Sequence, residues 1–316
     1  MNYSSGNIIY TFERLCATNL SDLDKLYTAV YNHPRPAGYF AKKYDTAYTG
    51  IEYTGFIAYD EHHQPAAYYG VVPCFIKYNG KLILAAQSVD TMTHPLHRLK
   101  GLFVQLAKNT FKLCTQEGIK IIFGFPNQNS VKGFVDLDWE TTETMELYLI
   151  PVETIPIENI AEHTPLLGKL YKEYQYQVLK KYLVPQKGIE NSVLNDGFSG
   201  VNRDELYFNH KDCHETQVLR IGKALLWVKI KNNAFIIGDI SCADKDFDGI
   251  MQKVHKLASV LGLNQVQFQT SPDTKASGLF SKRYHFIPSF PIMFKSLARN
   301  IKPDKIKFTF ADIDTF

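Results

Sequence analysis

The stretch THPLHRLKGLF, residues 93–103, lies between a sequence typical of a β-hairpin and a sequence typical of a helix. The side chains in it that are cationic or can become so are His94, His97, Arg98 and Lys100. Such a cluster at a helix start has three interpretations: a solvated loop, a nucleic-acid contact, or a cradle for a ligand that carries phosphate. The surrounding sequence decides between them.

The residues before this stretch predict a hairpin. Residues 66–92 contain two runs rich in Val, Ile, Tyr and Phe on either side of the pair Asn79-Gly80. Asn and Gly both tolerate positive φ, which the tight turn of a two-residue hairpin requires. The second strand should therefore run from about residue 81 to residue 92.

The residues after the stretch predict a helix and then a strand. From about Arg98 the apolar residues recur with helical spacing, and Gly118 stands where a glycine often ends a helix. The segment 119–125 is short, apolar and β-branched, which is typical of a buried strand. Strand, loop, helix and strand together form a βαβ unit.

The second half of the chain repeats this order, which indicates an internal duplication. Residues 224–240 predict a hairpin that turns at Asn232-Asn233, and a helix and a strand should follow at 247–262 and 266–270. We expect two domains, 1–149 and 166–316, joined by a linker at 150–165 that contains three prolines. In the second copy the basic loop is replaced by the acidic segment SCADKDFDG, and the C-terminal run KIKFTF predicts an edge strand.

Composition narrows the class of protein. The chain has 316 residues, of which 45% are hydrophobic and 21% are charged, and its net charge of +3 is too small for a general nucleic-acid binder. Five widely spaced cysteines without a CxxC pair predict reduced thiols, and the start has no secretory signal, so we expect a cytoplasmic protein. We expect no membrane span. His210, Cys213 and His214 are interpreted as a surface turn, and no metal site is predicted.

The run from Arg98 to Phe103, RLKGLF, resembles the R/Q-x-x-G-x-G/A segment of the GNAT superfamily, the GCN5-related N-acetyltransferases. In that family the segment holds the pyrophosphate of acetyl-CoA. Residues 124–139, GFPNQNSVKGFVDLDW, resemble the family's stretch around helix four, where the matching positions are Asn127, Ser130, Phe134 and Trp139. The resemblance implies an α/β protein of two tandem GNAT-like domains, each a mixed, mostly antiparallel twisted sheet flanked by helices, with a degenerate second copy.

The resemblance also implies the cofactor site. The residues expected to contact acetyl-CoA, or another acyl-CoA, are Ser88, Val89, Asp90, Thr91, His94, Arg98, Leu99, Lys100, Gly101, Leu102, Phe103, Asn127 and Ser130. Two positions depart from the family pattern: Phe103 replaces a small residue of the phosphate loop, and Phe134 replaces a tyrosine that protonates the leaving thiolate in many relatives. Phosphate binding is therefore the better supported part of the resemblance.

Acyl transfer to an amine requires a group that takes a proton from the attacking ammonium. The candidates for this base are Asp90, on the strand that would pass the thioester, Glu52 and His94. Tyr39 and Tyr44, in the aromatic stretch 38–56, are expected to contact the acceptor. A thiol with a pKa near 8.5 can leave without a dedicated acid.

The sequence thus predicts an acyl-CoA-dependent N-acyltransferase, with acetyl-CoA as the expected donor. The acceptor would be a primary amine on a small metabolite, an amino sugar or a peptide. The alternative is a non-catalytic acyl-CoA-binding or interaction protein that kept the phosphate loop. A third possibility, a transferase that uses aminoacyl-tRNA, would require a broad basic channel.

Overall fold

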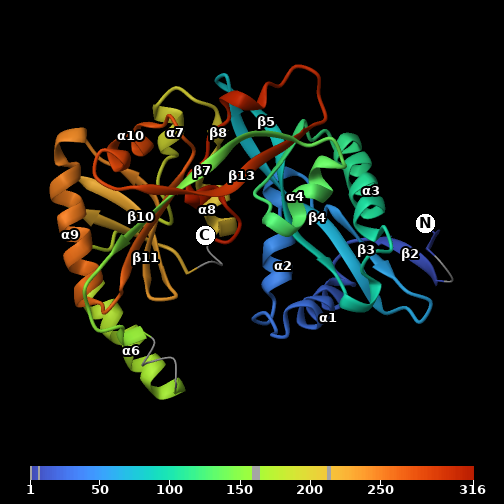
Figure 1. Cartoon of the computed structure of the whole chain (residues 1–316), viewed down its shortest axis with the longest axis horizontal. Coiled ribbons are helices and arrows are strands. Elements are labelled where there is room, and N and C mark those ends of the chain that lie inside the picture. Colours follow the sequence, from blue (N-terminus) through green and yellow to red (C-terminus); the bar gives the residue numbers. More distant parts are fainter. Residues whose placement is uncertain (1, 6–7, 159–163, 212–214) are drawn as a thin grey trace. The chain divides into compact units, whose positions relative to one another are not determined.

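The computed structural model describes residues 2–5, 8–158, 164–211 and 215–316, and the chain divides into two compact units. Unit 1 comprises residues 1–142 and 291–304, and unit 2 comprises residues 143–290 and 305–316. These boundaries differ from the predicted domains, because two long strands each begin in one unit and end in the other (Figure 1). They are β7 (Glu140–Pro151) and β13 (Phe286–Ser296).

Unit 1 is built on an antiparallel sheet that has one parallel pair. Its strands are β1 (Asn2–Ser5), β2 (Ile8–Arg14), β3 (Gly55–Tyr59), β4 (Pro65–Tyr78), β5 (Lys81–Thr93) and β6 (Ile121–Gly124), followed by the end of β13. Its helices are α1 (Leu20–Tyr31), α2 (Tyr39–Tyr44), α3 (Leu102–Gln116) and α4 (Gln128–Val135), with short 3-10 turns η1 (Ala47–Thr49) and η2 (Pro95–His97). The strands follow one another in sheet order, and only β5 and β6 run parallel.

The two faces of this sheet carry separate hydrophobic clusters. One cluster packs under α3 and includes Tyr69, Leu106 and Phe111. The other packs under α1 and α2 and includes Leu23 and Phe40. Helices α1 and α2 therefore cover one face of the sheet, and α3 covers the other (Figure 1).

The predicted hairpin with its turn at Asn79-Gly80 is present, formed by β4 and β5. Asn79 and Gly80 have φ values of 47° and 78°, so both adopt the left-handed conformation that the turn requires. The helix that follows begins at Leu102 and not at Arg98, because Gly101 at φ 74° sets its start. Residues 98–101 are therefore loop, although their apolar spacing fits a helix.

Unit 2 repeats the order of elements found in unit 1. Its strands are the main part of β7, then β8 (Gly200–Val201), β9 (Gln217–Ile221), β10 (Ala224–Lys231), β11 (Ala234–Ser241) and β12 (Gln265–Thr270). Its helices are α6 (Pro165–Leu179), α7 (Ser192–Asn195), α8 (Glu205–Lys211), α9 (Phe247–Val260) and α10 (Lys275–Ser281), with 3-10 turns η4 (Asp244–Asp246), η5 (Pro303–Lys305, shared with unit 1) and η6 (Phe310–Asp312).

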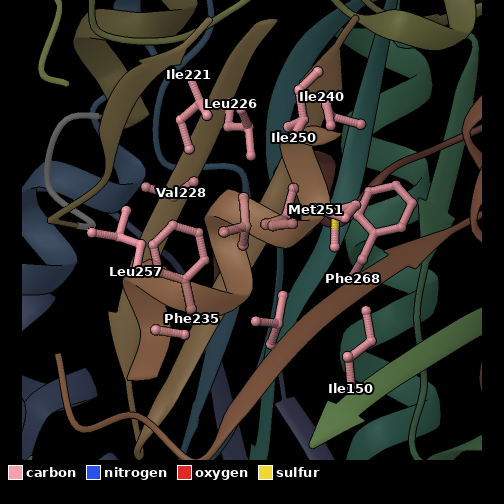
Figure 2. Close-up of a cluster of buried hydrophobic side chains, with 14 of the residues drawn as sticks. Ile150, Ile221, Leu226, Val228, Phe235, Ile240, Ile250, Met251, Leu257 and Phe268 are labelled. Carbon is pink, nitrogen blue, oxygen red and sulfur yellow. The ribbon is translucent and has the colours of Figure 1, made fainter. Parts of the chain in front are cut away.

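The sheet of unit 2 runs β7-β12-β11-β10-β9, with β11 and β12 parallel. Figure 2 shows its core, in which side chains of α9 such as Ile250 and Leu257 point at strand residues such as Phe235 and Phe268. The second hairpin turns at Asn232 and Asn233, both at positive φ, so the predicted repeat of hairpin, helix and strand is present.

The C-terminal segment departs from the prediction of an edge strand. Ile306, Lys307, Phe308 and Thr309 are buried and pair with the rest of unit 2 only through isolated bridges. The alternation of polar and apolar residues in KIKFTF therefore does not correspond to one exposed and one buried face. Both sides of the segment are covered, and it packs into unit 2.

A buried lysine in α8 should make unit 2 sensitive to pH. Burial lowers the pKa of Lys211 to about 8 from 10.5, and Nζ donates to the carbonyl oxygen of Ile313 at 2.6 Å. Between pH 8 and pH 10.5 the unfolded chain binds a proton that the folded chain has released, so stability should rise with pH in this window. Urea unfolding of wild type and Lys211→Met at pH 7 to 10 checks this.

The quantity to follow is the free energy of unfolding of wild type minus that of Lys211→Met, because other titrating groups cancel in the difference. We expect this difference to increase from pH 8 to pH 10. Parallel pH curves for the two proteins would show that Lys211 is not buried in its charged form at neutral pH.

Candidate functional site

Strands β5 and β6 separate at the place where the sequence predicts a site. They pair in parallel only through residues 85–87 and 121–123, and β6 ends at Gly124 while β5 continues to Thr93. From Ser88 onward, the edge of β5 on this side has no strand partner among the described residues. Its backbone amides and carbonyls are available to an extended ligand.

A β-bulge interrupts β5 in this unpaired stretch. Tyr68 pairs with Met92 but Gly70 pairs with Val89, so two residues of β5 lie opposite one of β4. One of the two is Asp90, whose φ is 50°. Bulges bend a strand and re-aim its side chains, and they are frequent next to active sites.

The two histidines of the loop at 94–101 face the protein. The His94 backbone N–H donates to the carbonyl oxygen of Ala66 at 2.8 Å. The Nδ1 atom of His97 forms a hydrogen bond with the Tyr10 hydroxyl at 2.9 Å, and Nε2 lies 3.8 Å from Asp60. Burial lowers the pKa of His97, so its ring is uncharged at neutral pH. These residues hold the loop onto the sheet.

Arg98 and Lys100 differ from the histidines because their cationic groups make no hydrogen bond or ion pair within the described part of the chain. The loop beneath them is fixed, since Tyr3 donates to the carbonyl oxygen of Lys100 at 3.1 Å. Arg98 and Leu99 form a hydrogen-bonded turn, and after it the backbone N–H groups of residues 101–104 donate to no acceptor in the described residues. Gly101 caps α3 without a side-chain hydrogen bond. Within the described residues, two cationic groups without a partner therefore lie beside four backbone N–H groups without an acceptor.

The backbone geometry of the loop suits an anion. Leu99 has φ 60° and Gly101 has φ 74°, and alternation of backbone hand turns successive N–H groups toward one side. These groups continue into the positive end of α3. A Cβ at Gly101 would lie 2.7 Å from the Tyr3 hydroxyl, so glycine is also needed for close packing.

Leu102 and Phe103, two residues predicted to contact the cofactor, and Phe134 have side chains that pack in the core. Leu102 is buried under α3, and Phe103 packs against Tyr69 and Phe134 with ring centroids 5.6 and 5.8 Å apart. Phe103 therefore does not obstruct the loop, and its backbone N–H remains available. Phe134 is buried against Trp139, with centroids 4.5 Å apart, so its ring faces the core.

The polar residues at the start of α4 have structural partners. Asn127 caps the helix and accepts at Oδ1 from the backbone N–H of Asn129 at 3.0 Å and of Ser130 at 3.2 Å. The Ser130 hydroxyl donates to the Asn127 carbonyl oxygen at 3.1 Å. On β5, the Ser88 hydroxyl donates to the Tyr69 hydroxyl at 3.0 Å. Contact of Asn127, Ser130 and Ser88 with a cofactor stays a prediction.

Asp90 lies in a buried polar cluster. Its Oδ2 accepts from Lys43 Nζ at 2.7 Å and from the Tyr44 hydroxyl at 2.9 Å, and the Lys43 and Asp90 side chains are only 3% and 8% exposed. Oδ1 makes no hydrogen bond within the described residues. Tyr44 is itself buried, so its hydroxyl serves Asp90 instead of facing solvent. Lys43 was not predicted, because nothing in the sequence links it to a residue 47 positions later.

Arg35 is a second residue that the sequence did not point out. Its guanidinium lies between two aromatic rings, 4.5 Å from the Tyr27 centroid and 4.6 Å from that of Tyr39. Its Nε is buried without a hydrogen-bond partner in the described part of the chain. Lys43 Nζ lies 5.6 Å from the centroid of the same Tyr39 ring, so Arg35 lies close to the Lys43–Asp90 pair.

Glu52 lies apart from this cluster on an exposed loop. It lines a groove of about 720 Å³ together with Arg14, Tyr53 and Glu117. Arg14 pairs with Glu117 and also donates to the carbonyl oxygen of Glu52. A catalytic role for Glu52 is untested by this geometry.

In the described ranges, no group of acidic, histidine or cysteine residues could hold a metal ion. Cys213 and His214 lie outside those ranges, so the surface turn predicted for them and His210 stays a prediction. None of the described helices is long and apolar enough to cross a membrane.

The sequence of unit 1 was compared with known protein families. Residues 12–141 match the family described as an acetyltransferase (GNAT) domain. The match includes the splayed strands, the bulge and the loop with free N–H groups, and it ends just after Trp139. A comparison with curated proteins finds no match for the chain.

Solved structures show that the GNAT-like fold extends beyond this domain. A probable N-acyltransferase from Enterococcus faecalis V583 is 10% identical, with a TM-score of 0.60 over 91% of this chain and 73% of its own. A putative acetyltransferase from Pyrococcus horikoshii is 11% identical, with a TM-score of 0.56 over 97% and 95%. N-myristoyltransferase of Saccharomyces cerevisiae, solved with myristoyl-CoA, is 11% identical, with a TM-score of 0.53 over 98% and 84%.

At these identities the likeness shows the fold alone. It confirms the predicted class, an α/β protein with mostly antiparallel sheets flanked by helices. The individual residues of the site rest on the geometry described above.

Proposed function

We propose that the GNAT domain binds an acyl-CoA, with acetyl-CoA as the expected donor, and transfers the acyl group to a primary amine in the cytoplasm. The acceptor is a small metabolite, an amino sugar or a peptide. The observation that carries the proposal is the loop in which the four consecutive N–H groups of residues 101–104 have no acceptor among the described residues, with Arg98 and Lys100 beside them.

The loop supplies the features that a pyrophosphate needs. Unpaired N–H groups and the positive end of α3 attract negative charge, and charge-assisted hydrogen bonds from Arg98 strengthen the contact. The equivalent position in unit 2 is unsuited to phosphate. Helix α9 has Asp248 in its first turn, preceded by Asp244 and Asp246. We therefore assign one acyl-CoA site, in unit 1, and regard unit 2 as a degenerate copy.

The unpaired edge of β5 would hold the pantetheine arm and the thioester. An extended arm can pair with the edge of residues 88–92 in the manner of an added strand. Backbone N–H groups near the bulge, at Val89 to Thr91, would stabilise the oxyanion. Removing one such donor costs about 3 kcal/mol in other enzymes.

We assign Asp90 as the general base, the group that accepts the proton of the attacking amine. Its Oδ2 is held by Lys43 and Tyr44, while Oδ1 can accept a proton or a hydrogen bond from the attacking nitrogen. Phe134 has no acidic proton to donate, so no acid at that position protonates the leaving thiolate. A thiol with a pKa near 8.5 can leave without one. Glu52 and His94 remain the other candidates for the base.

The alternative, an acyl-CoA-binding protein without activity, shares the phosphate loop but gives no role to the free Oδ1 of Asp90. No observation favours it over transfer. The two functions differ in one result, because only the enzyme releases CoA when an amine is added.

Reversing the charge at Arg98 should weaken acetyl-CoA binding. A charge-assisted hydrogen bond contributes about 1.5–3 kcal/mol, so Arg98→Glu should lower the affinity about 10- to 100-fold or more. Arg98 is exposed, so the melting temperature should change little. Isothermal titration calorimetry with acetyl-CoA measures the effect.

The matched control is Arg220→Glu, which makes the same charge change at an exposed position on β9. It should bind acetyl-CoA as the wild type does. Equal affinities for wild type and Arg98→Glu would show that the loop does not hold the phosphates.

A further inference from the structure

The two units share an arrangement of charged side chains. In unit 1, Arg35 precedes α2 and Lys43 follows it by eight residues. In unit 2, Arg203 precedes α8 and Lys211 again follows by eight residues. Both pairs stand before a hairpin that carries a bulge. The bulged strand supplies an aspartate to each cluster.

These aspartates are Asp90 in unit 1 and Asp239 in unit 2. Asp90 pairs with Lys43 at 2.7 Å, and Asp239 pairs with Arg203 at 2.6 Å. Each guanidinium also lies on aromatic rings, since Arg203 is 5.5 Å from the Trp227 centroid and Arg35 lies between two tyrosines. The two clusters are therefore similar in composition, although the aspartate is bound by the lysine in unit 1 and by the arginine in unit 2.

In unit 2 the C-terminal segment of the chain supplies a carboxylate that pairs with the arginine. The C-terminal segment packs on β11, where Phe316 lies beside Gly238 and Trp227. From this segment, Asp312 Oδ1 accepts from Arg203 Nε at 3.0 Å and lies 2.9 Å from Nη2. A carboxylate thus binds the Nε edge of the arginine.

In unit 1 no carboxylate of the described residues pairs with the arginine, and the Arg35 side chain as a whole is partly exposed. Arg35 Nε is buried and has no hydrogen-bond partner in the described ranges, and no ion pair of Arg35 is present there. Its tyrosine stack fixes the plane of the guanidinium, so little side-chain entropy remains to be lost when a ligand binds. The described residues of unit 1 supply no counterpart to Asp312.

We infer that Arg35 binds a carboxylate of the acceptor, which makes the substrate an amine that carries a carboxylate, such as an amino acid or a peptide with a free C-terminus. This inference rests on the proposed function. A guanidinium recognises a carboxylate through two parallel hydrogen bonds, which a neutral amide cannot reproduce. Asp90 lies near Arg35 and would face the amine of the same molecule.

Paired probes test this directly. Wild type saturated with CoA is titrated with L-amino acids and dipeptides, each beside its C-terminal amide, which keeps the amine and removes only the carboxylate charge. We expect at least one acid to bind about tenfold or more tightly than its amide. In Arg35→Gln, which keeps the side-chain length, this preference should disappear while the acetyl-CoA affinity stays unchanged.

Arg299→Gln, an exposed arginine of the same unit, is the control and should keep the preference for acids. Amides that bind as well as acids, a preference that survives in Arg35→Gln, or no binding of any acid would each overturn the inference. A different result would contradict the proposed function: no binding of acetyl-CoA by wild type, or equal affinities of wild type and Arg98→Glu for acetyl-CoA.

Discussion

Arg203→Met should lower the free energy of unfolding by about 3–5 kcal/mol, because it leaves two buried carboxylates without their cation. The side chains of Arg203, Asp239 and Asp312 are all 0% exposed. The guanidinium also donates to the Thr309 hydroxyl at 2.7 Å. Methionine fills a similar volume but satisfies none of these groups. Urea unfolding followed by circular dichroism measures the change.

Arg283→Met is the matched control for this substitution. Arg283 forms an ion pair with Asp248 at 2.7 Å, but both side chains are about half exposed, at 50% and 52%. Exposed pairs contribute about 0–1 kcal/mol, so this variant should stay close to wild type. A loss below about 1 kcal/mol in Arg203→Met would contradict the buried network. Replacing both aspartates by asparagine in the Arg203→Met background should recover part of the loss.

Gly70→Ala should cost about 2–3 kcal/mol and impair the site next to it. A Cβ at Gly70 would lie 1.9 Å from the hydroxyl oxygen of Tyr68, whose ring is buried. The ring must leave its position, and forced repacking of a filled core is destabilising. Because Gly70 pairs with Val89 at the edge of the bulge, acyl transfer should also fall. Thermal or urea unfolding and a thiol-release assay report the two effects.

Two further variants make this prediction specific. Gly249→Ala, within α9, meets no atom within 4 Å and should raise stability by up to about 1 kcal/mol. Tyr68→Leu added to Gly70→Ala should restore part of the lost stability, because it removes the clashing end of the ring. If Gly70→Ala were as stable as Gly249→Ala, the close contact between the Tyr68 hydroxyl and Gly70 would be contradicted.

Local sequence signals predicted the parts of the fold that local physics decides. The Asn79-Gly80 turn needs only two residues that accept positive φ, and α3 needs only its own apolar spacing. The exchange of β7 and β13 between units could not be read this way, because a strand pattern does not name the partner strand. KIKFTF shows the same limit, since alternation predicted an edge strand where both sides are buried.

The same distinction applies to the residues of the candidate site. The phosphate loop was recognised because Arg98, Lys100 and Gly101 are consecutive, or nearly so, in the chain. The burial of Phe103 and Phe134 in the core and the pairing of Lys43 with Asp90 depend on contacts between distant segments. Arg35 could have been found from one signal, the spacing of eight residues to a lysine that recurs at Arg203 and Lys211.

The most direct test of the central claim is CoA release from acetyl-CoA by wild type across a panel of amines, with product mass measured in the same reaction. We predict that thiol appears only when a suitable amine is present, in equal amount to an acetylated product that is 42 Da heavier than that amine. Tight acetyl-CoA binding with no amine-dependent thiol release across the panel would contradict transfer and favour a protein that only binds acyl-CoA.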